Sequence, residues 1–505
     1  MFLESAQPYP RIVARAGIAH NIIRCYIIRS YKLSNYKKQE SSMFVGREKE
    51  LATLEALYAS GKFEMPVIYG RRRVGKTRLI SEFIQGKRAV YFQARRTNAQ
   101  ANLDLLSLAI SEGVANGIAG SYASFDAAFD AIATLSREQK LIVVIDEFPY
   151  LAQSDSSLPS LLQEKIDHVF KESTQLMLIL CGSSLSFMEE QVLGYQSPLY
   201  GRRTAQMKIL PLDFFTVQTY LASMSAEDAA IMYGATNGVP AYMEMVDPTK
   251  DATENICNLF LKTDGYLYEE PSNLLLQECR APEQYDAIVQ AIARGRSRLA
   301  EIANTAHIPE SNTRTYLRKL ESLGIVKREM PFGNDSTKKV IYSLEDSMFR
   351  FWYKFVPQNI GLIENDMAEI AFSRIEQGIP EFMGAVFETI CSQWLIQQAK
   401  TGAFSIAPAA IGRWWGNNPQ TKAQEEVDIV VGDNAGSLAL CECKWRNELC
   451  GADVAKTLVR RSELFKANEK QLFVFSKSGF TSGCVEYAQQ QGNITLVSFA
   501  DMTNR

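Results

Sequence analysis

Gly70-Arg71-Arg72-Arg73-Val74-Gly75-Lys76-Thr77 follows the apolar run at 66–69 and precedes a helical pattern that begins at Arg78. The stretch matches the pattern G-x-x-x-x-G-K-[ST], and its position between a strand and a helix predicts a phosphate-binding loop. The two glycines allow backbone N–H groups to approach phosphate oxygens closely, and the helix N-terminus adds its positive end. A chance match in a loop rich in glycine and arginine is the alternative.

The loop predicts ATP and Mg²⁺ as cofactors. In loops of this kind the lysine, here Lys76, reaches the β- and γ-phosphates, and the hydroxyl of Thr77 ligates Mg²⁺. We expect the nucleotide to be bound by the loop and the first residue after it, namely Gly70, Arg71, Arg72, Arg73, Val74, Gly75, Lys76, Thr77 and Arg78.

A second half of the same site is predicted at 141–147, which reads Leu-Ile-Val-Val-Ile-Asp-Glu. A continuous aliphatic run that ends in two carboxylates is typical of a buried parallel strand presenting acids at the carboxyl edge of a sheet. We expect Asp146 to hold the Mg²⁺ and Glu147 to orient or deprotonate the attacking water. Alone, the segment could also be a core strand capped by solvated acids. Beside the phosphate-binding loop, it predicts hydrolysis of ATP.

Length and composition indicate an ordinary globular chain of several domains. The 505 residues are 46% hydrophobic and 22% charged, and they are too many for one core. A net charge of −3 gives no global attraction to nucleic acid, so such binding would need a local patch. No apolar run is long enough to span a bilayer, so no membrane partner is expected. The nine cysteines lack disulfide-like spacing, which favours reduced thiols and a cytoplasmic location.

The first 42 residues differ from the rest because they are basic. Seven lysines and arginines stand against Glu4 and Glu40, and the run 18–28 is too short for a membrane helix. A targeting peptide is one interpretation. A tail of little structural importance, or an upstream start codon read in error, is the favoured one, because Met43 directly precedes the first folded pattern at 44–48.

Two further strands are predicted at 90–92 and 176–180, and alternation of strands with helical patterns favours a parallel sheet. Together with Phe44-Val45-Gly46-Arg47-Glu48, the phosphate-binding loop, Asp146-Glu147-Phe148 and Cys181-Gly182-Ser183-Ser184, residues 43–246 resemble the archaeal-type ATPase family, a branch of the AAA+ and signal-transducing P-loop ATPases. The resemblance implies that Ser183 is a polar sensor and that Gly201-Arg202-Arg203 supplies an arginine finger. It also implies that 238–240 lies at the entry to a helical lid. For Arg202 and Arg203, a solvated basic turn is the alternative.

The middle of the chain predicts a winged helix. Helical patterns at 284–293, 299–303 and 312–323 are followed by strand patterns at 325–328 and 339–342, which is the helix, helix-turn-helix, hairpin order. His307 is expected in a turn. Side chains able to contact phosphates and bases are Asn312, Thr313, Arg314, Tyr316, Arg318 and Lys319 on the third helix, with Lys338 and Lys339 on the wing. Because winged helices also serve as protein-contact modules, DNA contact and protein contact both stay open.

The last third of the chain carries a second candidate site. Asp428 lies in the strand 425–431, and Glu442 and Lys444 share one face of the strand 438–444, with Cys441 and Cys443 on the other. Two carboxylates beside a lysine suit Mg²⁺ and an attacking hydroxide. The pattern resembles the PD-(D/E)xK nuclease fold, in which Glu388 matches the acid of the first helix. The wider region from 342 to 444 resembles the nuclease-like domain often fused to archaeal-type ATPases.

One observation limits the nuclease hypothesis. Val427 stands where the pattern has proline, so a decayed nuclease fold or a surface-charged sheet is the alternative.

A zinc site at Cys441, Cys443 and Cys450 is disfavoured, because the spacing lacks C-x-x-C pairs and a fourth ligand is missing.

The predicted fold class is α/β: a P-loop NTPase parallel sheet with a helical lid, then a winged helix, then a small α/β domain like that of restriction endonucleases. The predicted divisions are a basic tail at 1–42, an ATPase core at 43–212, a lid at 213–275, a winged helix-turn-helix at 276–345, a helical linker at 346–380 and a nuclease-like domain at 381–505. We expect an ATPase that couples nucleotide state to DNA binding and cleavage, with DNA and further copies of the chain as partners. The rival is an ATP-dependent signalling or regulatory protein whose C-terminal domain only binds.

Overall fold

The computed structural model describes residues 44–114, 120–334, 339–419 and 421–504. The chain divides into two compact units, Met1–Val45 and Gly46–Arg505, and the second unit carries all the elements discussed below. The predictions for 1–42 and for Lys338 lie outside the described residues. Within the described part of the chain, no helix has the length and apolar character needed to cross a membrane.

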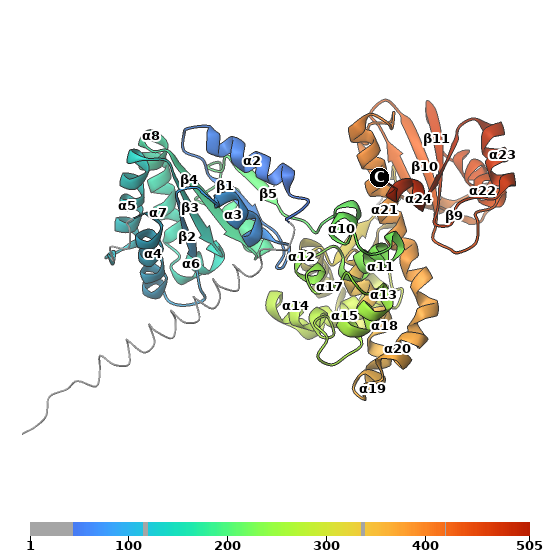
Figure 1. Cartoon of the computed structure of the whole chain (residues 1–505), viewed down its shortest axis with the longest axis horizontal. Helices are drawn as coiled ribbons and strands as arrows, with labels where there is room; N and C mark the ends of the chain where they lie inside the picture. The colour runs from blue at the N-terminus through green and yellow to red at the C-terminus, as the bar shows by residue number, and fades with distance from the viewer. Residues whose placement is uncertain (1–43, 115–119, 335–338, 420, 505) are drawn as a thin grey trace, which may run out of the picture. The chain divides into compact units, whose positions relative to one another are not determined.

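The first sheet is built from five parallel strands in the order β2-β3-β4-β1-β5 (Figure 1). The strands are β1 (Pro66–Tyr69), β2 (Ala89–Gln93), β3 (Leu141–Asp146), β4 (Leu176–Gly182) and β5 (Ala205–Lys208). Every residue of β1, β3 and β4 is buried, as their continuous apolar sequences require of strands covered on both faces. Because β4 lies between β1 and β3, the phosphate-binding loop, Asp146 and Ser183 all emerge at one edge of the sheet.

Helices flank and follow this sheet. Those interleaved with the strands include α2 (Glu48–Ala59), α3 (Lys76–Ile84), α4 (Ala99–Val114), α5 (Phe125–Glu138), α6 (Phe148–Ser154), α7 (Leu158–Lys165) and α9 (Leu185–Phe187). After β5 come α10 (Phe214–Tyr220), α11 (Ala226–Thr236), α12 (Pro240–Met243), α13 (Ala252–Phe260) and α14 (Glu270–Glu278). This helical region occupies the range predicted for the lid.

A helix-turn-helix with a hairpin follows. It consists of α15 (Pro282–Ala293), α16 (Leu299–Ala306), α17 (Glu310–Ser322) and the antiparallel pair β6 (Val326–Glu329) and β7 (Ile341–Leu344). His307 adopts a left-handed conformation with φ of 56°, which ends α16 and makes the turn into α17. Leu317 and Leu320 point into the core from α17, at the spacing that the helical pattern predicts.

The C-terminal part begins with α18 (Ser347–Phe355), α19 (Ile360–Ile363), α20 (Ala368–Ile375) and the long α21 (Ile379–Thr401). Its sheet has the order β12-β11-β10-β9-β8, with β9 antiparallel to both neighbours and β10, β11 and β12 parallel. The strands are β8 (Ala410–Asn417), β9 (Gln424–Gly432), β10 (Ser437–Lys444), β11 (Glu469–Ser476) and β12 (Ile494–Ser498), and the remaining helices are α22 (Ala452–Ser462), α23 (Ser482–Gln491) and α24 (Phe499–Thr503).

Buried apolar side chains of the first sheet, the helical regions and the C-terminal sheet pack together, although the sequence predicts separate domains. One continuous cluster runs from Phe63 to Met502 and includes Cys441 and Cys443 on one face of the C-terminal sheet. A second cluster, containing Leu440 and Cys450, packs α22 and α23 on the other face. The α/β class is confirmed, with a parallel P-loop ATPase sheet, a helical region with a helix-turn-helix, and then a C-terminal sheet domain.

Candidate functional site

Two glycines set the shape of the phosphate-binding loop. A Cβ atom on Gly70 would lie 2.4 Å from the carbonyl oxygen of Ile209, so no larger residue fits at this position without moving the backbone. Gly75 has φ of 88°, in the left-handed region that glycine tolerates best, and it forms the N-cap of α3. The backbone is therefore held in a tight loop at the positive end of a helix, as anion binding requires.

The loop brings Lys76, Thr77 and Asp146 together. Nζ of Lys76 donates hydrogen bonds to the carbonyl oxygens of Gly70 (2.8 Å) and Arg71 (3.0 Å), and burial lowers the pKa of this ammonium group. The Thr77 hydroxyl donates to Oδ2 of Asp146 over 3.1 Å. In P-loop proteins a hydroxyl and a carboxylate placed like those of Thr77 and Asp146 can hold a nucleotide-bound Mg²⁺ ion, while the lysine contacts the phosphates.

Tyr91 is part of this group, and the sequence analysis missed it. Its hydroxyl donates to Oδ2 of Asp146 over 2.5 Å, because β2 and β3 pair in register up to Gln93 and Asp146. Burial, together with the charge of Asp146, raises the pKa of Tyr91. The phenol thus stays protonated and holds the carboxylate in place. No local sequence signal identifies Tyr91, because strand pairing alone brings the two residues together.

Glu147 and Ser183 are also in contact. Oε2 of Glu147 accepts hydrogen bonds from the hydroxyl of Ser183 (2.9 Å) and from its backbone N–H (3.3 Å). Glu147 has φ of 54°, a left-handed conformation that is strained for a residue with a side chain. The turn after β3 therefore directs the carboxylate of Glu147 toward the end of β4, where Ser183 lies.

The three arginines of the loop pair with acids of later regions. Arg71 forms a buried ion pair with Asp346, the residue that caps the N-terminus of α18. Nε of Arg72 donates to Glu278 of α14 over 3.0 Å, and Arg73 pairs with Glu270 at the start of the same helix. In this structure all three guanidinium groups thus contact protein carboxylates.

The two candidate finger arginines differ in their contacts. Nε and Nη2 of Arg202 bind both carboxylate oxygens of Asp167 at 2.5–3.1 Å, and Nη1 donates to the carbonyl oxygens of Pro198 and Tyr200. Arg203 makes no hydrogen bond or ion pair with any other described residue. In this structure Arg202 is thus bound within its own turn, and Arg203 makes fewer contacts with the described residues.

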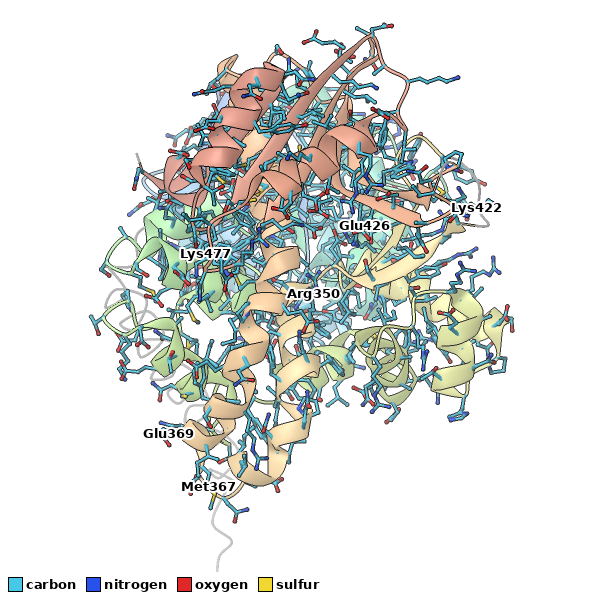
Figure 2. The ribbon with its side chains drawn as sticks, turned by 90° about the vertical axis from the view of Figure 1, so that its right-hand side faces the viewer. Arg350, Met367, Glu369, Lys422, Glu426 and Lys477 are labelled. Atoms are coloured by element: carbon cyan, nitrogen blue, oxygen red, sulfur yellow. The ribbon has the colours of Figure 1, made fainter. Side chains whose placement is uncertain are left out.

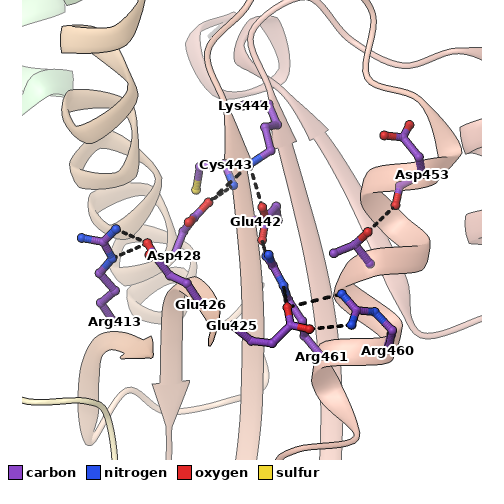
Figure 3. Close-up of polar contacts among 11 residues, drawn as sticks. Arg413, Glu425, Glu426, Asp428, Glu442, Cys443, Lys444, Asp453, Arg460 and Arg461 are labelled. Carbon is purple, nitrogen blue, oxygen red and sulfur yellow. Dashed lines mark hydrogen bonds and ion pairs between the residues drawn. The ribbon is translucent and has the colours of Figure 1, made fainter. Parts of the chain in front are cut away.

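The second candidate site lies on β9 and β10 (Figure 3). Oδ2 of Asp428 accepts a hydrogen bond from the backbone N–H of Cys443 (2.8 Å) and lies 3.9 Å from Nζ of Lys444. Nζ of Lys444 donates to Oε1 of Glu442 over 2.6 Å. Burial and the charge of Glu442 raise the pKa of Asp428 to about 6, while Glu442 and Asp428 outweigh burial and raise the pKa of Lys444.

Two arginines of α22 complete this site, and the sequence analysis missed both. Nη1 of Arg461 donates to Oε2 of Glu442 over 2.8 Å, and its Nε donates to Glu425 over 3.0 Å (Figure 3). Nη1 of Arg460 also binds Glu425, at 2.5 Å. Each carboxylate oxygen of Glu442 thus has a cationic partner, Lys444 on one side and Arg461 on the other. The helical period gives no sign of this contact, because it depends on how α22 packs on the sheet.

Glu388 approaches this group from α21. Burial raises its pKa to about 7, and the neighbouring charge of Asp428 adds to the rise. The carboxylate of Glu388 has no hydrogen-bond partner among the described residues. Across those same residues, no three or more His, Cys, Asp or Glu side chains form a group arranged to hold a metal ion. The acids are therefore neighbours in pairs, Asp428 with Glu442 and Asp428 with Glu388.

The predicted DNA-contacting residues of α17 divide into two sets. Thr313 is fully buried and donates to the carbonyl oxygens of Ile308 and Pro309, so its prediction as a contact residue is wrong. Tyr316 packs edge-on against Tyr285. Nζ of Lys319 donates to the Ser186 hydroxyl over 2.8 Å. The remaining three, together with the wing lysine, are exposed, and they are Asn312, Arg314, Arg318 and Lys339.

The parallel sheet, the glycine-framed loop and the Thr77–Asp146 pair define a P-loop ATPase. The chain belongs to the archaeal ATPase family whose model, described as "ATPase domain predominantly from Archaea", matches residues 44–246. An IclR helix-turn-helix domain matches 287–329, and a family of "Archaea bacterial proteins of unknown function" matches 352–458.

Membership extends over most of the chain. "Uncharacterized protein MJECL04" of Methanocaldococcus jannaschii is 31% identical over 428 residues, which are 84% of this chain and 92% of the relative. "Uncharacterized ATP-binding protein MJ0423" of the same organism is 48% identical over 46 residues, 9% of this chain and 78% of that one.

Two solved structures are similar to part of this chain at low identity. The Walker-type ATPase PABY2304 of Pyrococcus abyssi has a TM-score of 0.48 and 20% identity, over 62% of this chain and 96% of that chain. The ORC2 protein of Aeropyrum pernix, solved as ADPNP–ADP complexes, has a TM-score of 0.44 and 17% identity, over 64% and 96%.

Proposed function

We propose that this ATPase is a switch in which nucleotide bound at the phosphate loop controls DNA binding by the winged helix and Mg²⁺-dependent DNA cleavage by the C-terminal domain. In the ATP site, Lys76 would bind the phosphates, and Thr77 and Asp146 would hold Mg²⁺, which neutralises charge on the phosphate oxygens. Glu147, held by Ser183, would orient or deprotonate water, and Arg203 would approach the γ-phosphate.

The observation that carries the switch is the buried ion pair between Arg71 and Asp346. Nζ of Lys76 donates to the carbonyl oxygens of Gly70 and Arg71, so phosphates that attract this ammonium group compete with the backbone at Arg71. Asp346 lies two residues after the end of β7 and caps α18 by accepting hydrogen bonds from the backbone N–H groups of Met348 and Phe349. A change in the phosphate loop thus has a direct path to the end of the winged helix, as a two-state coupling requires.

The coupling is tested with DNA affinity measured in each nucleotide state. Fluorescence anisotropy of a labelled duplex would be recorded with ATP, with ADP and without nucleotide, for the wild type and for Lys76→Ala. We expect the wild type to change its affinity with the nucleotide and the variant to show the same affinity in all three conditions. A variant that responds to ATP as the wild type does would rule out the switch.

Cleavage would depend on Asp428, Glu442 and Lys444, with Glu388 as a further acid. The two carboxylates would share a Mg²⁺ ion, and Lys444 would stabilise the attacking hydroxide. The raised pKa of Asp428, caused by burial and Glu442, supports this role, because crowded carboxylates gain from a divalent cation. Such an ion would replace one of the cationic partners of Glu442.

A plasmid incubated with the protein, ATP and either Mg²⁺ or Mn²⁺ tests this activity. Asp428→Ala and Lys444→Ala should abolish nicking, whereas Asp453→Ala should leave it unchanged. Asp453 is a matched control because it is an exposed acid of the same domain, on α22 (Figure 3). Cleavage that survives Asp428→Ala would come from a contaminant or from another site.

A second candidate function is an ATP-dependent regulator whose C-terminal domain binds without cutting. The double pairing of Glu442 with Lys444 and Arg461 favours it, since internal cations can replace a metal. Absence of cleavage with every metal, together with nucleotide-dependent DNA or protein binding, would select this alternative.

A further inference from the structure

The face of the winged helix that usually reads DNA is poorly equipped in this chain. On α17, Thr313 is buried, Tyr316 packs on Tyr285, and Lys319 binds Ser186 of α9. The exposed cations of α17 are Arg314 and Arg318, and the acids Glu310 and Glu321 lie on the same helix. The charge of Glu321 acts on Arg318 and also on Arg328 of β6. This helix therefore offers little net positive charge to a phosphate backbone.

The turn between α15 and α16 is more basic. Residues 294–298 read Arg-Gly-Arg-Ser-Arg, and all three arginines are exposed. Gly295 has φ of 85°, which lets the chain turn tightly between them. No acidic side chain forms an ion pair with Arg294, Arg296 or Arg298 in the described part of the chain. Three exposed guanidinium groups thus lie on one turn, with no ion pair to any described residue.

The wing hairpin adds a fourth arginine to this turn. The backbone N–H of Tyr342 on β7 donates to the carbonyl oxygen of Ser297 over 2.7 Å, which places the turn beside the hairpin. Arg328 on β6 is the register partner of Tyr342, and its exposed side chain also lacks an ion pair among the described residues. Since adjacent strands lie about 4.8 Å apart, Ser297 and Arg328 are roughly 10 Å apart. We call Arg294, Arg296, Arg298 and Arg328 the basic edge.

The basic edge borders a hollow that extends to the second candidate site. The hollow has a volume of about 1370 Å³, and Arg296 and Arg328 line one part of it. Glu388, Asp428 and Arg413 line another. Arg314 and Arg318 are not part of its lining. Figure 2 shows Arg350, which also lines it, and Glu426 near the centre of the face turned toward the viewer. One hollow is thus lined by two of these arginines, Arg296 and Arg328, and by Glu388 and Asp428, with further acids between them, namely Glu321, Glu329, Glu345 and Glu381.

We infer that the basic edge, and not α17, binds the phosphate backbone of nucleic acid and directs it into this hollow toward Asp428 and Glu388. The inference rests on the proposed function, because it names the surface that the DNA would contact. Guanidinium groups bind phosphate oxygens through two parallel N–H donors, and each contact releases a counterion from the nucleic acid. Up to four such contacts would give a salt dependence with a slope of about −3.6.

The test compares two pairs of exposed arginines in the full-length protein. Arg296→Ala with Arg328→Ala removes two charges from the basic edge, and Arg314→Ala with Arg318→Ala removes two from α17. Affinity for a labelled duplex would be measured from about 50 to about 200 mM salt, a range over which binding through phosphate contacts weakens steeply. We expect the basic-edge variant to bind about tenfold more weakly and to lose about 1.8 from the slope, while the α17 variant keeps both values.

The alternative outcomes are distinguishable from failure of the proposed function. A loss with the α17 pair alone, or equal losses with both pairs, overturns the inference and leaves DNA binding intact as a function. Absence of DNA binding by the wild type in every nucleotide state overturns both. Circular dichroism of the two variants checks their folding, and all four replaced side chains are exposed.

Discussion

Replacing Asp346 with asparagine tests the proposed link between the phosphate loop and the winged helix, because Asp346 is the partner of Arg71 in that link. The side chain of Asp346 is 0% exposed and that of Arg71 is 7% exposed, so water does not screen their attraction. Asparagine can still cap α18, because its oxygen accepts from the backbone N–H groups of Met348 and Phe349. The substitution therefore removes the negative charge, and it also replaces Oδ2, which accepts from Nη1 of Arg71, with an amide N–H donor.

The expected cost follows from the buried arginine that is left. Burial alone would lower the pKa of Arg71, but Asp346 and Tyr242 outweigh it and raise that pKa, so the guanidinium stays charged in the folded protein. Removing one partner of a buried ion pair costs about 3–5 kcal/mol. We expect the cost of Asp346→Asn to lie near the lower end of this range, because the Tyr242 hydroxyl still lies 3.4 Å from Nη2 of Arg71. Nucleotide-dependent DNA binding should be lost at temperatures where the variant is folded.

Scanning calorimetry of a double-mutant cycle measures this cost. Arg71→Met combined with Asp346→Asn removes both charges and should recover most of the lost stability. Glu189→Gln is the control for an exposed pair, since Glu189 and its partner Lys208 are 37% and 43% exposed and such pairs contribute about 1 kcal/mol or less. A cost below about 1 kcal/mol for Asp346→Asn, or strictly additive effects in the cycle, would refute the reasoning.

Three further predictions concern single residues. Gly70→Ala should weaken binding of a fluorescent ATP analogue at least tenfold, because its Cβ would meet the Ile209 carbonyl oxygen at 2.4 Å; unchanged binding would contradict the tight-loop geometry. Arg203→Ala should lower kcat by about 10³-fold if it is the finger, whereas Arg202→Ala should lower thermal stability with kcat largely kept; steady-state kinetics and melting separate them. Glu388→Gln should stabilise the metal-free protein at pH 8 by at most about 3 kcal/mol, since the folded pKa of about 7 lies above the ordinary 4.5. The folded protein binds the proton on Glu388 more tightly than the unfolded chain does, so the stability of the wild type falls as the pH rises from 4.5 to 7. In melting curves recorded in EDTA, the stability gained by Glu388→Gln should therefore disappear below pH 4.5.

The ATP site could be predicted from the sequence because its signals are local. The spacing of Gly70, Gly75 and Lys76 is a property of eight consecutive residues, and Asp146 ends a strand whose burial is visible in its own apolar letters. Helix and strand periods likewise predict the helix-turn-helix and the strands that carry Asp428 and Glu442. Backbone hydrogen bonding and side-chain alternation act over a few residues, so these features need no knowledge of distant contacts.

The partners of these residues were decided by tertiary structure. Tyr91 reaches Asp146 through strand pairing, Arg71 reaches Asp346 across 275 positions, and Arg461 reaches Glu442 because α22 packs on β10. Local periodicity cannot specify which of many exposed-looking charges becomes buried against another.

The sequence by itself therefore determined the class of this protein: a P-loop ATPase joined to a helix-turn-helix and a C-terminal sheet. The tertiary structure alone decided that the loop arginines bind protein carboxylates and that Thr313 of α17 is buried. It also decided that the four arginines of the turn and wing have no ion-pair partner among the residues described. The physical reason is that a motif depends on backbone geometry over a few residues, whereas the partner of a charge depends on which surfaces pack together, and packing joins residues far apart in the chain.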